Sequence, residues 1–276
     1  MIRSLFSAVS GLRGHQTMLD VIGNNIANVN TASFKSSRVL FSDLYYQTLT
    51  SASAPTATAG GQNPTQIGYG SLVSSIDVVN SRSSFQQTSR SLDVYVAGEG
   101  YFTVQNATGG KSYTRLGAFS FDPNGNLLDS DGNKVMGQTT TGTTMTTTPA
   151  PITIANFSNY TSVSILPNGT ISAIDSTTGA VAELGQLAIA VFQNPNGLQQ
   201  QGTSYYAETG NSGAPTYAVA GSATAGALVS GGLEMSNVDL SKEFTDMIIA
   251  QRGFQANARV ITTSDQVLEE LVNLKR

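Results

Sequence analysis

The chain has 276 residues, enough for one large domain or two smaller ones with a real core. Charged residues make up only 12% of the chain and the formal net charge is −4, so it lacks the strong positive field that attracts nucleic acid or an anionic membrane. It contains no cysteine, which excludes disulfides, thiolate nucleophiles and zinc sites of the cysteine type without indicating a compartment.

Apolar residues recur at helical spacing near both ends of the chain. Near the N-terminus they stand at Leu5, Leu12, Leu19, Ile22 and Ile26. Near the C-terminus, steps of seven residues connect Leu240, Met247, Phe254, Ile261 and Leu268. These ten positions, here called the heptad residues, predict helices over 2–28 and 240–274, roughly 40 and 50 Å long at about 1.5 Å per residue.

The fold class expected from this pattern is α+β. We expect the two terminal helices to pair as a coiled-coil-like inner layer, with a β-rich domain between them in sequence. The alternative is a single α+β domain in which two amphipathic helices pack on one sheet. Asn237 or Asp239 should cap the last helix, whose first turn also carries Glu243, and Lys275 and Arg276 suit its other end.

Short runs of alternating residues between the helices predict strands. They cover 72–79, 92–97, 100–104, 113–121, 127–128, 134–136, 152–154, 162–166, 170–174, 186–192 and 205–208. Turn dipeptides predict hairpins at Asn124-Gly125, Asp131-Gly132, Asn168-Gly169 and Asn196-Gly197. The Thr-rich tract 139–148 is expected to be an exposed loop.

Composition also suggests the domain boundaries. Residues 51–70 and 209–226 are rich in Ser, Ala, Thr and Gly, so we expect loosely ordered connectors there. The expected division is a terminal helical domain of residues 1–30 and 238–276, connectors 31–71 and 209–237, and a β-rich outer domain 72–208. The first residues form a poor secretory signal, so export would need a route without a cleaved signal peptide.

The residues that usually carry chemistry are sparse. His15 is the only histidine and stands between Leu12 and Leu19, so a structural role is expected over a catalytic one. Gly98-Glu99-Gly100 lacks the third glycine of a dinucleotide loop. The acidic turn that starts at Asp122 fails the EF-hand spacing. We therefore expect no enzyme activity, cofactor, metal or small-molecule substrate.

Three stretches resemble the bacterial flagellar rod and hook axial proteins. The first is Leu19 to Thr31 with Phe34-Lys35, which includes Asn24, Asn25 and Asn28. The second runs from Gly100-Tyr101-Phe102 through Tyr113-Thr114-Arg115 to Gly117-Ala118-Phe119. The third is Glu234 to Leu240 followed by Gln251-Arg252-Gly253-Phe254 and Thr262 to Asp265. They occur in the family's order and span nearly the whole chain.

The resemblance implies a structural subunit that polymerises with itself into a helical tube. The ending 261–276 is hook-like, which implies a short hook protein without the outer second β-domain, acting as a flexible universal joint that transmits torque from rod to filament. The distal rod protein, a rigid drive shaft, is the alternative. Implied partners are the rod, hook-cap and hook-filament junction proteins and the export apparatus, and the implied location is the extracellular hook or the basal body of the flagellum.

Two other classes compete with this hypothesis. One is a secreted β-rich adhesin that oligomerises through a small coiled coil. A hydrolase is more distant and would have to depend on His15.

Overall fold

The computed structural model describes residues 2–56, 60–138, 142 and 149–274. These residues divide into two compact units. Unit 1 contains residues 1–29, 36–79 and 238–276, and unit 2 contains residues 30–35 and 80–237. The segments that we expected to be connectors are thus divided between the units, since residues 36–71 belong with the helices and 209–237 belong with the β-rich part. Most of the Thr-rich tract, 139–141 and 143–148, lies outside the described residues.

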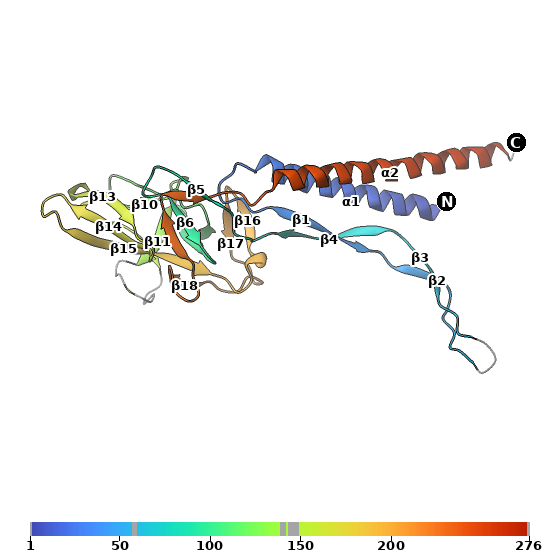
Figure 1. The fold of residues 1–276 in the computed structure, drawn as a ribbon, viewed down its shortest axis with the longest axis horizontal. Helices are drawn as coiled ribbons and strands as arrows, with labels where there is room; N and C mark the ends of the chain where they lie inside the picture. Colours follow the sequence, from blue (N-terminus) through green and yellow to red (C-terminus); the bar gives the residue numbers. More distant parts are fainter. Residues whose placement is uncertain (1, 57–59, 139–141, 143–148, 275–276) are drawn as a thin grey trace. The chain divides into compact units, whose positions relative to one another are not determined.

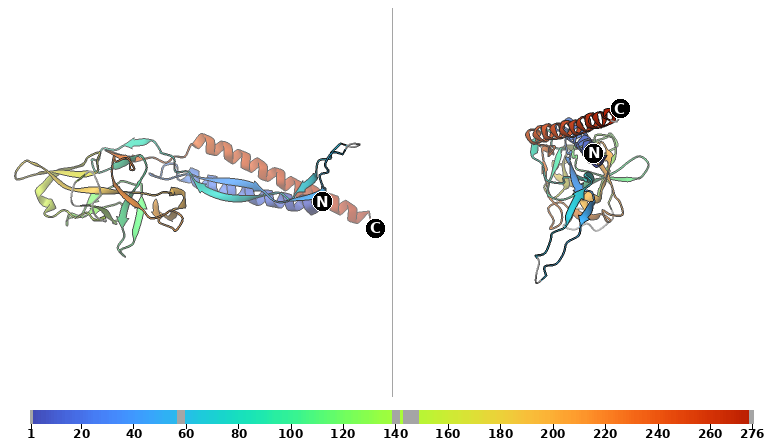
Figure 2. Two further views of the ribbon diagram at one scale, coloured as in Figure 1. Left: turned by 90° about the horizontal axis from the view of Figure 1, so that it is seen from below. Right: turned by 90° about the vertical axis from the view of Figure 1, so that its right-hand side faces the viewer.

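Two long helices dominate unit 1. The helix α1 (Ile2–Ala27) and the helix α2 (Leu240–Asn273) lie side by side and run antiparallel, as Figures 1 and 2 show. The Oδ1 atom of Asp239 accepts hydrogen bonds from the backbone N–H groups of Ser241 (2.9 Å) and Lys242 (3.3 Å), which caps α2 as expected. Lys275 and Arg276 lie outside the described residues.

Two antiparallel strand pairs complete unit 1. The strand β1 (Ser37–Asp43) pairs with β4 (Ser71–Val78), and β2 (Tyr46–Thr50) pairs with β3 (Thr65–Gly68). Residues 65–68 are therefore ordered in a hairpin, where we expected a loose connector. Backbone hydrogen bonds in both directions between Ser53 and Gln62 extend this pairing toward the hairpin tip. Composition misled us here, because Thr and Gln can pair through the backbone with little apolar burial.

Unit 2 is built almost entirely of short strands. Their bounds are β5 (Phe85–Gln87), β6 (Val94–Ala97), β7 (Tyr101–Gln105), β8 (Lys111–Thr114), β9 (Ser120–Phe121), β10 (Leu127–Leu128), β11 (Lys134–Gln138), β12 (Ala150–Pro151), β13 (Tyr160–Ile165), β14 (Thr170–Asp175), β15 (Val181–Val191), β16 (Gln199–Gly202), β17 (Tyr205–Ala207), β18 (Thr216–Val219), β19 (Ala227–Ser230) and β20 (Gly232–Glu234). Short 3-10 turns occur at Phe157–Asn159 and Pro195–Gly197.

Twelve of these strands form one sheet, whose main path is β13-β14-β15-β11-β7-β8-β17-β16. Neighbours on this path are antiparallel. The strand β18 adds to β15, although it lies in the expected connector 209–226. Two small pairs, β6 with β19 and β5 with β20, complete unit 2.

The central strands of unit 2 are buried on both faces. In β7, Phe102 and Val104 belong to the larger apolar core, whereas Tyr101 belongs to a second, mostly aromatic core with Tyr113 and Phe192. Successive residues of a strand point to opposite faces, so this division shows that side chains cover both sides of β7. The two cores of unit 2 are formed by residues of unit 2 and contain no residue of α1 or α2.

Three of the hairpin expectations are confirmed, and one is wrong. The dipeptides Asn124-Gly125, Asp131-Gly132 and Asn168-Gly169 connect antiparallel neighbours, and each glycine has a positive φ. Asn196-Gly197 instead closes a 3-10 turn between β15 and β16, which are not paired with each other. Pro195 favours this turn because its ring sets the helical φ angle.

Neither helix in the described part of the chain is apolar enough over its length to cross a membrane.

Candidate assembly site

Small residues form the closest contacts between α1 and α2. Ala250 is completely buried, and Ala8 is also buried. A Cβ atom added to Gly253 would lie 2.5 Å from the His15 ring, and one added to Gly11 would lie 2.8 Å from the Asn257 amide. Each glycine therefore makes room for a side chain of the other helix, Asn257 beside Gly11 and His15 beside Gly253. His15 fills this contact, which agrees with the structural role expected for it.

The heptad residues are placed unevenly around this contact. Ile22 is buried, while Leu5, Leu12, Leu19, Ile26, Met247, Ile261 and Leu268 are half-buried. Leu240 and Phe254 are exposed. A strict step of seven drifts by about 20° per heptad around a straight helix, or about 80° from Leu240 to Leu268. The drift explains why the pattern lies toward α1 at Ile261 and turns away from it at Leu240.

Two stripes of exposed apolar side chains lie on either side of the α1-facing line of α2. Leu240, Phe244 and Ile248 form the Phe244 stripe, in which Ile248 is 59% exposed. Ile249, Val260, Val267 and Leu274 form the Val260 stripe on the other side. Contiguous apolar surface of this kind marks an interaction site in soluble proteins. The pattern of seven alone did not predict either stripe.

The family-motif residues are divided between structural and exposed positions. Asn25 is buried, and its amide group donates to the Ser37 carbonyl (2.8 Å) and accepts from the Ser37 N–H (3.0 Å), which fixes α1 to β1. The Asn28 side chain donates to Asn24 Oδ1 (2.7 Å) at the end of α1. Phe34 is half-buried, and Gln251 and Arg252 are exposed on α2.

A buried ion cluster in unit 2 connects three distant parts of the chain. Lys35 Nζ lies 2.6 Å from Glu234 Oε1, and Arg115 Nε lies 3.4 Å from Glu234 Oε2. All three side chains are at least 97% buried. Lys35 also donates to the Ser81 carbonyl (2.8 Å), and the Arg115 guanidinium donates to the Gly98 carbonyl. One carboxylate thus serves two buried cations.

Burial and charge act in opposite directions on Lys35. Desolvation lowers the pKa of its ammonium group, and the neighbouring Glu234 carboxylate raises it by a smaller amount, so the pKa lies below the usual lysine value. The guanidinium of Arg115 is centred 5.5 Å from the Tyr101 ring, a cation–π contact that adds to its stabilisation. The cluster was missed at the sequence level, although Lys35, Arg115 and Glu234 all lie inside the motif stretches.

The acidic turns act as local structural elements. Asp122 accepts from the backbone and side-chain nitrogens of Asn126, both at 2.7 Å, and these hydrogen bonds lower the pKa of its carboxyl group. Asp129 accepts from the Tyr205 hydroxyl (2.6 Å) and the Asp131 N–H (3.1 Å). Among the described residues, no group of three or more His, Asp or Glu side chains is placed to hold a metal ion.

Comparison with known proteins identifies the family. Models of three protein regions match the chain: the flagella basal body rod protein over residues 5–35, the D1 domain of the flagellar hook protein FlgE/F/G over 95–173, and the C-terminal region of the flagellar basal body rod FlgEFG protein over 229–274. The flagellar basal-body rod protein FlgG of Bacillus subtilis is 48% identical over 277 residues, with all of both chains covered.

The chain belongs to the family of flagellar basal-body rod and hook proteins. The FlgG rod protein of Borreliella burgdorferi is 36% identical over 278 residues, and the hook protein FlgE of the same organism is 30% identical over 444 residues; each comparison covers both chains fully. The chain is therefore a structural component of the bacterial flagellum and not an enzyme, as the sequence motifs had indicated. The buried cluster takes one residue from each matched region: Lys35, Arg115 and Glu234.

The charge balance of the cluster leads to a ranked expectation. Glu234→Gln would leave Lys35 and Arg115 buried without an anion, and we expect it to lower the free energy of unfolding by about 3 to 5 kcal/mol. Lys35→Met would leave the Arg115–Glu234 pair intact, so it should lower the free energy of unfolding clearly less than Glu234→Gln does. Denaturant unfolding of both variants measures the two losses. Equal losses, or a larger loss in Lys35→Met, would contradict the conclusion that Glu234 neutralises both cations.

The close approach of the helices gives a second expectation. Gly23→Ala, where a Cβ meets nothing within 4 Å, should stabilise the chain by about 1 kcal/mol through helix propensity. Gly253→Ala should not stabilise the chain, because the added Cβ atom would clash with the His15 ring. In a His15→Ala background the clash is absent, so Gly253→Ala should then stabilise the chain as Gly23→Ala does. Thermal unfolding followed by helical circular dichroism measures the cycle. Additive effects of the His15 and Gly253 changes would show that the two positions do not touch.

Proposed function

We propose that this chain is a subunit of the flagellar rod that polymerises with copies of itself into a helical tube. The observation that carries the proposal is the 48% identity with a rod protein over the full length of both chains. In the tube, α1 and α2 pair as a coiled-coil-like inner layer in which the heptad residues contact one another and the neighbouring copies. Most of the β-rich residues 72–208 belong to unit 2, which forms the outer domain in this proposal.

The exposed apolar stripes of α2 supply the driving force for this assembly. An aliphatic or aromatic side chain gains about 1.5 to 3 kcal/mol when it is fully buried. The Phe244 and Val260 stripes together carry seven such side chains, so neighbours that cover them would stabilise the polymer strongly even after the entropy of association is subtracted. The inner layer should therefore be the cohesive layer of the tube.

A flexible hook is the second candidate, and a specific observation favours it. The chain is 30% identical to a hook protein over the full length of both, although that comparison extends over 444 positions against the 276 residues here. In a hook, the Ser-, Thr- and Gly-rich surfaces of the outer domains would rearrange as the tube bends, because neutral hydrogen bonds to water and to protein differ little in free energy. The polymer would then act as a universal joint, and not as a rigid drive shaft.

The partners proposed for the tube ends are other flagellar axial proteins. If the chain is a rod subunit, these partners are rod and hook subunits. If it is a hook subunit, they include the hook-cap and hook-filament junction proteins. We further propose that the chain reaches its place through the flagellar export apparatus without a cleaved signal peptide, and that a hook would lie outside the cell.

The shape of the assembled polymer separates the two candidates. Purified chain, concentrated until it polymerises, should form straight tubes of high bending stiffness if it is a rod subunit. Electron microscopy measures the curvature and its variation between tubes. Curved, readily bent tubes would favour the hook, and finite oligomers at every concentration would contradict both.

The role of the stripes is checked by substitution. Phe244→Ser and Ile248→Ser should each raise the critical concentration for polymerisation by roughly 4- to 15-fold, because about half of each side chain is still exposed in the single chain and its removal forfeits about 0.8 to 1.6 kcal/mol of contact burial. The unfolding free energy of the monomer should change little, since both side chains are more than half exposed in the single chain. Gln255→Ser, at an exposed polar position of α2, is the matched control. Sedimentation measures the critical concentration, and unchanged values would remove the stripes from the assembly site.

A further inference from the structure

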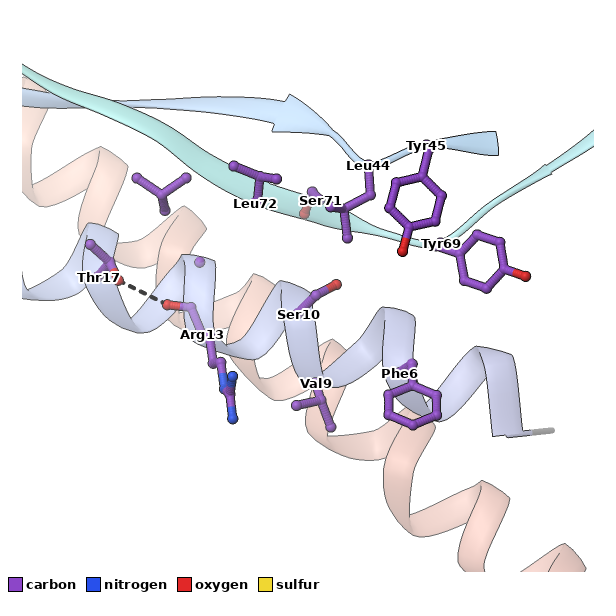
Figure 3. A pocket seen from close by; sticks show the side chains of 12 residues that line it. Phe6, Val9, Ser10, Arg13, Thr17, Leu44, Tyr45, Tyr69, Ser71 and Leu72 are labelled. Carbon is purple, nitrogen blue, oxygen red and sulfur yellow. Dashed lines mark hydrogen bonds between the residues drawn. The ribbon is translucent and has the colours of Figure 1, made fainter. Parts of the chain in front are cut away.

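An apolar groove lies beside the first half of α1 in unit 1. It is lined by Phe6, Val9 and Arg13 of α1 and by Tyr45, Tyr69 and Leu72 from the strand region, among others, and has a volume of about 610 Å³ (Figure 3). A cavity of about 150 Å³ is enough for one benzene-sized group, so the groove has room for about four. Phe6 is 65% exposed and Tyr45 is 74% exposed, so both side chains present most of their surface to the solvent in the single chain.

One cation of this groove has no anionic partner. The guanidinium of Arg13 is exposed and forms no ion pair with any residue that the structure describes. The groove lining contains no acidic residue, and the second nearby cation, Arg3, lies over the Tyr69 ring at 5.9 Å. An occupant that combines apolar side chains with a carboxylate would therefore suit the groove.

The end of α2 has these properties, and its apolar side chains are largely exposed among the residues that the structure describes. Gly11 meets Asn257 and His15 meets Gly253, so the antiparallel register places Ile2, the start of α1, level with Gln266. The last two turns of α2 extend beyond α1, as Figures 1 and 2 show. There Val267, Glu270, Leu271 and Leu274 follow the spacing i, i+3, i+4, i+7 and share one face.

We infer that the end of α2 in one copy docks in the groove beside α1 of the next copy. The apolar side chains of Val267, Leu271 and Leu274 fill the groove, and Glu270 pairs with Arg13. The lengths agree, since residues 267–274 span roughly 12 Å of helix and Phe6 to Thr17 span roughly 16 Å. Groove and helix end are different surfaces of one chain, so the contact is head-to-tail and repeats without closing. This inference rests on the proposed tube and names one of its contacts.

Paired cysteines test the contact directly, because the natural chain has none. Val9→Cys combined with Leu271→Cys should give a ladder of covalent multimers when tubes are oxidised. A disulfide within one chain is excluded, because Val9 lies level with Arg259 and thus roughly 18 Å along α2 from Leu271, whereas the Cα atoms of a disulfide lie within about 7 Å. Val9→Cys with Asn273→Cys, which places the thiol on the opposite side of the helix end, is the matched control.

The outcomes separate this inference from the proposed function. Tubes that give a ladder with Leu271 and not with Asn273 support it. Tubes that give no ladder, equal ladders in both pairs, or dimers only would overturn the docking while leaving the tube intact. Failure of the unmodified chain to form tubes at all would instead overturn the proposed function, and the docking with it.

A charge exchange tests the same contact without cysteines. Arg13→Glu and Glu270→Arg should each raise the critical concentration by roughly two- to fivefold at low salt, the range for an exposed ion pair. The double variant should return to within about twofold of the natural chain, because the pair is restored with opposite sign. Single effects without recovery in the double variant would contradict the pairing of Arg13 with Glu270.

Discussion

The carboxylate of Glu234 is the group on which the organisation of unit 2 depends. It forms ion pairs with two buried cations, Lys35 from the segment that follows α1 and Arg115, which directly follows β8. The backbone adds to the same junction, since the Ser33 N–H donates to the Glu234 carbonyl at 2.8 Å. Glu234 stands five residues before the cap of α2. The chain therefore passes through one buried cluster shortly after it leaves the first helix and again shortly before it enters the last.

The helix pair uses a different kind of interaction. Glycines on each helix leave room for a side chain of the other, Asn257 beside Gly11 and His15 beside Gly253, while exposed apolar side chains lie on the flanks of α2. The positions buried inside the single chain are thereby separated on α2 from the surface proposed to contact other chains. Ala250 belongs to the buried positions, and Ile248, two residues earlier, belongs to the proposed contact surface.

Local signals predicted much of this structure, and long-range contacts explain most of what was missed. The helix limits, the Asp239 cap and three glycine turns depend on residues within a few positions of one another, which a sequence shows directly. The hairpin of β2 and β3 and the pairing of β18 with β15 depend on backbone partners that composition does not mark. The ion pair of Lys35 and Glu234 spans 199 residues, and nothing in either neighbourhood indicates its partner. The exposure of Leu240 follows from helical drift, which becomes visible only when the position of α1 is known.

In the proposed tube, the two apolar stripes on α2 also set the number of neighbours that a helix pair needs. A symmetric dimer would cover one flank and leave the aliphatic side chains of the other in water. Covering both stripes requires a different copy on each side. Each of those copies then still exposes one uncovered stripe, which the next copy can cover. Each subunit in such a polymer therefore contacts two neighbours through α2. The polymer stops growing only where the series of subunits closes on itself or where its last subunit meets a different protein.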